Sequence, residues 1–381
     1  MANNIENLTP QILASILSVL RESCIMPSLV NNNYSTEAAQ QGAVIDINDL
    51  EDMEAFDVTP GNFPDSGVLS DVVAQQKNLV LNKFKAVTFN MTDKELKEIQ
   101  EGTRPRAIEK AIKALANTIN ADIFGLYKEV YQVVGDAGTT PYGTSTVEAQ
   151  QAARVLTTAL ADPDERRMVL DPFGYANALG LGVLQKVNES GSSEALRDAM
   201  ITRALGFDWY QDQQVPTHTL GAPAIAAIDA DADAGATSLV LDDGAGADLA
   251  SLPAVGDVFT IAGNTQQYVV TTVSAETPTA NETTVGISPA LAANVTNNTV
   301  VTFVGSHVAN LAFHREAFAF ASRPLLDLET PGSIIQPLTD PVSGLAMRFE
   351  IQRQWKRTIF SVDCLYGVRA IRPALACRVA G

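Results

Sequence analysis

The sequence predicts an α+β protein in which a host of mixed helices and strands carries a small all-β unit as an insertion. A long apolar stripe at helical spacing runs through residues 104–134, and shorter helical and strand patterns follow it. Residues 222–306 then change in composition to Thr, Val, Ala, Gly and Asn, with short β-rich runs. The mixed pattern resumes at Leu311, so the all-β block is better interpreted as an insertion than as a terminal domain.

Charge is distributed unevenly along the 381 residues, whose formal net charge is −18. Residues 1–76 hold eleven acidic groups and one basic group, and residues 204–314 hold eleven acidic groups with neither Lys nor Arg. Residues 77–203 are neutral, and residues 315–381 carry +3. A protein that binds nucleic acid through its phosphates needs clustered Lys and Arg. This composition therefore argues against a nucleic-acid-binding protein of that kind.

Three further classes are excluded by the composition and the arrangement of apolar residues. A hydrophobic content of 46% is typical of a chain with a real core, which excludes wholesale disorder. No run of ~18 apolar residues is present, and the apolar run at 12–20 lacks a preceding basic residue. We therefore expect neither a membrane span nor a secretory signal. The three cysteines include no C-x-x-C pair, which favours buried thiols over a disulfide framework.

The N-terminal third is expected to be extended. Residues 1–42, with a helix at 12–20, are predicted to form an arm, and residues 43–103 an extended hairpin loop region that includes a strand around Ile45. Residues 77–91 form a fifteen-residue stretch in which side chains alternate between an apolar and a polar face, as in a β-strand. The apolar face of this stretch carries Leu79, Leu81, Val87, Phe89 and Met91, but is interrupted by Lys83 and Lys85. Charges on that face indicate a projecting hairpin that is not wholly packed on its own core.

The strongest periodic signal predicts one continuous helix. Its apolar positions step by three or four residues and are Ile108, Ile112, Leu115, Ile119, Ile123, Leu126, Val130 and Val133. About 30 residues at ~1.5 Å each predict a helix of ~45 Å within residues 104–140, long enough to brace a flat subunit. A two-stranded coiled coil is the alternative, which the lack of strict heptads weakens.

Shorter elements follow. Residues 141–221 are predicted to hold helices at 145–160 and 194–205, a strand at 167–170, and a helix that begins at Asp171-Pro172. The all-β block is predicted to form a small barrel or sandwich of five or six strands. Its β-rich runs are 238–241, 257–261, 267–271, 284–287 and 299–303. Residues 307–381 return to the host, with strands near 345–351 and 358–368.

Motifs for catalysis or metal binding are not found. His218, His307 and His314 lack metal-ligand spacing, and neither a Walker A motif nor a nucleophile elbow is present. Asp229, Asp231 and Asp233 alternate, but the Gly and Glu that an EF-hand loop requires are missing. We therefore expect no enzyme, no cofactor and no metal site. A weak cation site at this run or at Asp242-Asp243 is the alternative to a solvated acidic linker.

The C-terminal segment resembles a known family. Leu365-Tyr-Gly-Val-Arg-Ala-Ile-Arg-Pro373 is similar to the closing strand and turn of tailed-phage major capsid proteins with the HK97 fold, especially the P22-like coat proteins. The segments that begin at Arg167, Ala204 and Asn310 are also similar to coat-protein sequence. The resemblance implies an HK97-like capsid fold with a long spine helix in the peripheral domain (104–140). It further implies an axial domain (141–221 with part of 307–381) and an inserted β-barrel.

The function that the resemblance implies is a coat protein that self-assembles, as hexamers and pentamers, into an icosahedral shell around phage double-stranded DNA. Implied partners are scaffolding and portal proteins, with the DNA enclosed without sequence-specific contact and no membrane. The implied location is the virion capsid, assembled in the host bacterial cytoplasm. Candidate intersubunit contacts are Lys77, Lys83, Phe84, Lys85, Asp242, Asp243 and Asp248.

Two alternatives remain open at this point. One is an encapsulin-like nanocompartment shell, against which the inserted barrel counts because compartment proteins tend to be more compact. The other is a binding or adhesion protein with a β-sandwich recognition module at 222–306. That module has few aromatic residues, namely Phe259, Tyr268 and Phe303, whereas sugar-binding platforms usually need exposed rings.

Overall fold

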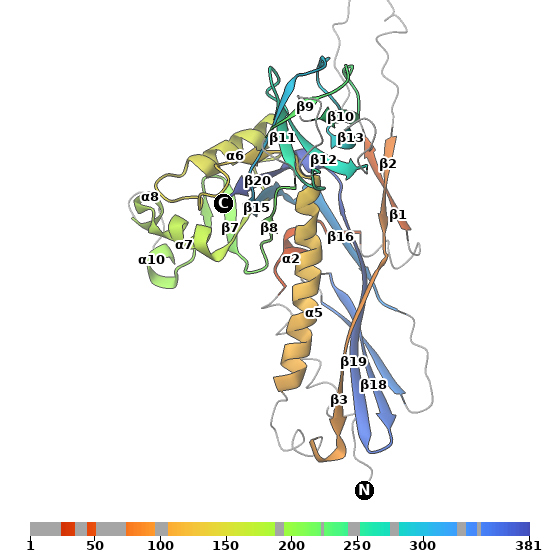
Figure 1. The fold of residues 1–381 in the computed structure, drawn as a ribbon. Coiled ribbons are helices and arrows are strands. Elements are labelled where there is room, and N and C mark those ends of the chain that lie inside the picture. Colours follow the sequence, from red (N-terminus) through yellow and green to blue (C-terminus); the bar gives the residue numbers. More distant parts are fainter. Residues whose placement is uncertain are drawn as a thin grey trace, which may run out of the picture.

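The computed structural model describes most of the chain and gives it an elongated shape. The described residues are 24–34, 44–50, 74–95, 106–186, 194–221, 225–242, 252–274, 282–325, 333–340 and 344–381. A compact part with short helices adjoins a barrel, and a long narrow sheet with one helix beside it extends away from both (Figure 1). The predicted helix at 12–20 lies outside the described residues.

The long sheet consists of five antiparallel strands centred on β19. They are β3 (Lys83–Thr92), β16 (Phe318–Arg323), β17 (Ser333–Thr339), β18 (Ala346–Gln354) and β19 (Arg357–Ala370). β3 pairs with one side of β19, while β18 and β16 follow one another along its other side. The predicted strands near 345–351 and 358–368 are thereby confirmed as β18 and β19.

The predicted 77–91 strand is divided between two sheets. β1 (Val44–Leu50) and β2 (Ala74–Val80) form a separate two-stranded antiparallel pair, whereas β3 joins β19. The inward side of this stretch includes Leu79, Leu81 and Met91, which are buried, while the alternation of burial is interrupted at the exposed Lys85. The period predicts which side chains face inward, but it carries no information about where the strand changes partners.

The long helix is shorter than the apolar stripe predicts. α5 covers Arg106–Phe124, and a 3-10 segment, η2 (Gly125–Glu129), follows it. At ~1.5 Å per residue α5 is ~28 Å long, so the prediction of one continuous helix to residue 134 was wrong. Gly125 marks the break, since glycine disfavours a helix interior. Leu126, Val130 and Val133 are nevertheless buried, because the chain turns into the core and not into solvent.

The compact part contains a seven-stranded sheet flanked by helices. Its strands are β4 (Val133–Val134), β5 (Arg166–Leu170), β6 (Arg203–Ala204), β7 (Phe207–Gln211), β8 (Thr217–His218), β15 (His307–His314) and β20 (Ala376–Ala380). The helices are α2 (Met26–Leu29), α6 (Val147–Thr158), α7 (Pro172–Gly180), α8 (Gly182–Gln185) and α10 (Glu194–Asp198). Short 3-10 turns, η3 (Arg315–Ala317) and η4 (Pro373–Leu375), complete this part.

Of two helices predicted in the compact part, one starts where expected and the other is shorter than expected. The predicted start of α7 is confirmed, since the Asp171 carboxylate accepts hydrogen bonds from the backbone amides of Phe173 and Gly174. The predicted helix at 194–205 was wrong beyond Asp198. There the chain forms a tight turn between β6 and β7, with Leu205 at φ 55° and Gly206 at φ 84°, a geometry that Gly permits at little cost.

The all-β block forms a closed barrel, as predicted. Its strands run in the order β10-β13-β12-β11-β14-β9. Their bounds are β9 (Ile225–Ile228), β10 (Ser238–Asp242), β11 (Val258–Ile261), β12 (Gln267–Val273), β13 (Thr283–Ser288) and β14 (Val300–Phe303). The barrel has its own apolar core, distinct from that of the host, and closure leaves it without free strand edges.

Candidate assembly surfaces

The β1–β2 pair has one anchored face and one exposed face. Ile45 and Leu79 lie opposite each other, fully buried, and pack in a cluster with Ala319, Ala321 and Ile371. On the other face, the opposed pair Val44 and Val80 is 44% and 42% exposed. The pair is therefore fixed at its base. Its outward face presents Val44 and Val80 at one end, and exposed polar residues such as Asp46 and Asn78 beyond them.

The C-terminal segment holds this base in place. A Cβ at Gly367 would clash with the Val80 carbonyl group, so glycine lets the chain cross closely over β19. The Lys77 Nζ donates a hydrogen bond to the Ile371 carbonyl at 2.6 Å, and the Arg369 guanidinium donates one to the Asn78 carbonyl. The Leu365–Pro373 segment that resembles capsid sequence thus has a physical role, which is to secure β2.

Lys83 lies on the apolar face of β3 because it has a partner on the helix. Its Nζ is 2.9 Å from the Asp122 Oδ1 on α5, and the Tyr366 hydroxyl donates a 2.5 Å hydrogen bond to the Asp122 Oδ2. Burial, together with this hydrogen bond, raises the pKa of the Tyr366 phenol. Asp122 therefore fastens α5 to two adjacent strands of the long sheet, β3 and β19.

The remaining predicted contact residues differ in exposure. Phe84 is 57% exposed on β3, and Lys85 beside it is also exposed. Asp242 is buried at the end of β10. Asp243 and Asp248 lie outside the described residues. The structure therefore brings Lys83, Phe84 and Lys85 together on one strand, with Lys77 nearby on β2, and places Asp242 apart from them in the barrel.

A buried polar network joins the barrel to the host. His218 on β8 contacts the Asp257 carboxylate at 2.8 Å through Nε2 and the Tyr127 hydroxyl at 3.1 Å through Nδ1. The other Asp257 oxygen accepts hydrogen bonds from the backbone amides of Gly221 and Ala254. Because Asp257 and His218 are both buried, each supplies the polar partner that the other needs.

Arg378 and Gln267 extend this joint. Arg378 is fully buried, donates to the Gly256 carbonyl at 2.8 Å, and lies over the Tyr127 ring. Burial lowers the pKa of its guanidinium to about 10. The Gln267 carboxamide accepts from the Val133 amide and donates to the Val133 carbonyl, at 2.7 and 3.1 Å. Sequence reasoning missed this network, since no short-range spacing links His218 to Asp257 or Gln267 to Val133.

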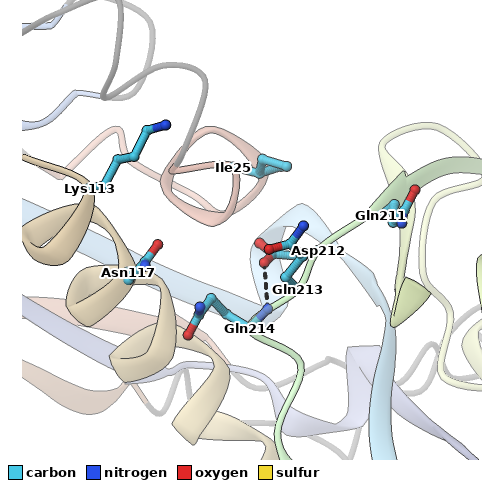
Figure 2. A pocket seen from close by; sticks show the side chains of 7 residues that line it. All are labelled: Ile25, Lys113, Asn117, Gln211, Asp212, Gln213 and Gln214. Carbon is cyan, nitrogen blue, oxygen red and sulfur yellow. Dashed lines mark hydrogen bonds between the residues drawn. The ribbon is translucent and has the colours of Figure 1, made fainter. Parts of the chain in front are cut away.

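A polar cavity of about 310 Å³ opens between α5 and the loop after β7. Figure 2 shows its lining, in which the Asp212 carboxylate turns toward the backbone of its own loop and accepts from the Gln214 amide at 2.8 Å. The Asn120 carboxamide donates to the second oxygen at 2.6 Å, and burial raises the pKa of Asp212. The other lining residues are Ile25, Lys113, Asn117, Gln211 and Gln213. This set offers hydrogen bonds but neither a histidine nor a thiol beside the carboxylate.

Other site types find little support in the described part of the chain. None of its His, Cys, Asp and Glu side chains gather in a group of three that suits a metal ion. Nor does any helix there combine the length and apolar character needed to cross a bilayer. The barrel aromatics Phe259, Tyr268 and Phe303 are all buried in its core, so they do not form a sugar-binding platform.

Comparison with known proteins gives matches among solved structures only. No family model and no curated protein matches the sequence. The capsid structure of cyanophage P-SCSP1u is 12% identical, with a TM-score of 0.49, covering 94% of this chain and 88% of that one. A Mycobacterium phage Che8 structure is 14% identical, with a TM-score of 0.48, covering 93% and 90%. A virus-like particle from Pyrococcus furiosus is 10% identical, with a TM-score of 0.40, covering 97% and 98%.

Proposed function

We propose that this chain is the major capsid protein of a tailed bacteriophage, which self-assembles into an icosahedral shell around double-stranded DNA. The observation that carries the proposal is the β1–β2 pair. A two-stranded pair is marginally stable by itself. This one is anchored on one face and exposes Val44 and Val80 on the other. A neighbouring copy that covers the exposed face would complete its burial.

The finer assignment follows the sequence resemblance. In this proposal the fold is HK97-like, with a P22-like insertion at 222–306 and the β1–β2 pair as the base of the extended loop region (43–103). Within residues 104–140, α5 (Arg106–Phe124) serves as the spine helix, and the long sheet belongs to the peripheral domain. The compact part is the axial domain (141–221 with part of 307–381). Residues 1–42 remain the proposed N-terminal arm.

The elongated shape supports assembly into a closed surface. The narrow sheet with α5 beside it gives the subunit separate ends (Figure 1). In this proposal one copy contacts the next through unlike surfaces. Such heterologous contacts generate rings, and here we propose hexamers and pentamers of a shell. Phe84 and Lys85, exposed on β3, are retained as proposed intersubunit contacts. Lys77 and Lys83 bind groups of their own chain, namely the Ile371 carbonyl and the Asp122 carboxylate. In this proposal they hold β2 and β3 in position and do not contact the neighbouring copy.

The charge distribution suits a container for DNA. Residues 204–314 contain neither Lys nor Arg, and the formal net charge of the chain is −18. An inner shell surface that does not bind phosphate lets the packaged DNA move and exit, whereas a basic inner surface would bind the DNA and retain it. We propose scaffolding and portal proteins as partners, assembly in the bacterial cytoplasm, and a final location in the virion capsid.

Electron microscopy of negatively stained protein tests the proposal. Protein expressed alone or with a scaffolding protein is expected to form hollow polyhedral particles. The double variant Val44→Asp and Val80→Asp should lower particle yield at least tenfold, because it charges the exposed face of the pair. The matched control is Val183→Asp, at an exposed position on α8. Persistent monomers or dimers of the unaltered chain, even with scaffolding protein, would refute the proposal.

A further inference from the structure

The far end of the long sheet carries an exposed tryptophan. β18 ends at Gln354 and β19 begins at Arg357, and these two residues pair, so Trp355 and Lys356 form a two-residue turn. Trp355 is 84% exposed, and the Lys356 Nζ lies 4.5 Å from the centre of its ring. The turn lies at the end of the long sheet that points away from the compact part and the barrel (Figure 1).

This exposure contrasts with that of the other tryptophan. The chain has two tryptophans, and the other, Trp209, is 4% exposed in the core of the compact part. A tryptophan side chain buries 150–250 Å² when covered, and tryptophan is among the residues that contribute most to protein interfaces. Trp355 is the first residue of a two-residue turn, so the paired strands on either side fix the backbone that carries its indole.

The tip is positively charged as well as apolar. The Arg353 guanidinium is 2.9 Å from the Asp93 carboxylate, so this cation is paired. The Arg357 Nε donates to the neutral Gln354 side chain at 2.8 Å. Within the described part of the chain, neither Lys356 nor Arg357 takes part in an ion pair. The tip therefore combines one uncovered indole with two unneutralised cations.

We propose that the Trp355 tip, consisting of Trp355, Lys356 and Arg357, docks onto an acidic surface of a second copy of this chain. Charge complementarity carries the choice of occupant. Residues 1–76 and 204–314 together hold twenty-two acidic residues and a single Lys or Arg. Of the described acidic residues, Asp46 on β1 and Asp231 and Asp233 in the barrel are exposed, so a neighbouring copy offers acidic surface. The indole would enter an apolar recess there, and the two cations would pair with carboxylates at its rim. The inference rests on the proposed self-assembly and assigns a contact to it.

Tryptophan fluorescence gives a direct readout on the intact chain. Because Trp209 is buried, acrylamide quenching of the unassembled protein reports mainly on Trp355. Assembly is expected to reduce the quenching constant of the Trp355 component at least threefold and to shift its emission to shorter wavelength. The Trp355→Phe variant isolates the Trp209 signal for subtraction. An unchanged quenching constant in assembled particles would overturn the inference.

Photocrosslinking identifies the occupant. A benzophenone side chain introduced at position 355 is expected to yield a covalent dimer whose second peptide lies within residues 1–76 or 204–314. Crosslinks to nucleic acid, to another protein, or to a basic segment of the second copy would each contradict the proposal. Assembled particles in which position 355 forms no crosslink would also contradict the proposal.

Variants separate this contact from assembly in general. Trp355→Ala and the double variant Lys356→Glu, Arg357→Glu should each raise the concentration needed for assembly about tenfold. The charge-preserving control Lys356→Arg, Arg357→Lys should stay within twofold of the unaltered chain. If the unaltered chain assembles and Trp355→Ala assembles equally well, only the tip contact is refuted. If the unaltered chain never assembles, the proposed function itself fails.

Discussion

At the scale of single residues, a few positions carry constraints that their neighbours do not. Gly367 permits the crossing of the Val80 region over β19, and Lys77 and Arg369 secure that crossing with hydrogen bonds to backbone carbonyls. His307 is buried at the barrel joint, its ring near that of His218, and the charge of Arg378 disfavours a second positive charge there. For Gly367 and His307 we predict the effect of a single substitution.

Substitution of Gly367 by Ala should destabilise the fold by about 1–3 kcal/mol, because the added methyl group overlaps the Val80 carbonyl. The free energy of unfolding from urea titration measures this effect. Gly180→Ala is the matched control, since a Cβ at Gly180 meets no other atom within 4 Å. Equal stability of the two variants would show that the crossing does not depend on glycine.

The stability of the protein should depend on His307 in mildly acidic solution. Burial, and then the positive charge of Arg378, lower the pKa of His307 from 6.5 to about 4. The unfolded chain therefore takes up a proton at this site at higher pH than the folded chain does. The stability contribution of neutral His307 is complete above pH 6.5 and is lost as pH falls toward 4, by roughly 2–3 kcal/mol.

His307→Asn tests this pH dependence, because an amide can still donate to the Gly305 carbonyl that His307 Nδ1 contacts. Unfolding free energies of both proteins between pH 7.5 and 4 should diverge, with the smaller decline in the variant. Parallel declines would assign the acid sensitivity to other groups.

At the scale of elements, periodicity predicted which faces are buried better than where elements end. The apolar stripe that contains Ile112 and Ile123 lies in the core, as expected, yet the helix stops at Phe124. The barrel strands were predicted because alternating β-rich runs with turns between them depend on local sequence. The change of partners between β2 and β3, and the pairing of Lys83 with Asp122, depend on contacts distant in sequence.

The attachment of α5 to the long sheet should depend on Asp122. Asp122→Ala leaves the Lys83 amine and the Tyr366 hydroxyl without this carboxylate, and should cost about 1–3 kcal/mol of unfolding free energy. Lys83→Met, which keeps the apolar contacts of the side chain, should cost less. A double-mutant cycle between Lys83 and Asp122 should give a coupling energy of about 0.5–1 kcal/mol, and a value near zero would show that the pair does not fasten the helix.

At the scale of the whole molecule, the barrel is joined firmly to the host. The His218–Asp257 contact, the Arg378 hydrogen bond and the Gln267 carboxamide all cross the same junction. The described acidic residues of the barrel, such as Asp231 and Asp233, are therefore held in a fixed relation to the host sheet. Sequence predicted the barrel and its charge, but its attachment depends on pairs of residues that no local pattern connects.

Loss of the Gln267 side chain should loosen this joint. Gln267→Ala removes two hydrogen bonds to the Val133 backbone and is expected to speed hydrogen exchange across β4 and β12 about tenfold. Gln266→Ala is the control, because among the described residues the Gln266 side chain donates to the carbonyl of the adjacent Gln267 and not to the host. Equal exchange in the two variants would mean that the barrel is held by its other contacts.

Self-assembly is the central claim, and sedimentation velocity of the purified chain tests it most directly. We predict discrete closed particles far heavier than the 40.5 kDa chain, formed at neutral pH either alone or on addition of a scaffolding protein. The same sample should show shells of uniform diameter under the microscope. A single boundary at the mass of a monomer or dimer, at every concentration and with scaffolding protein present, would contradict the claim.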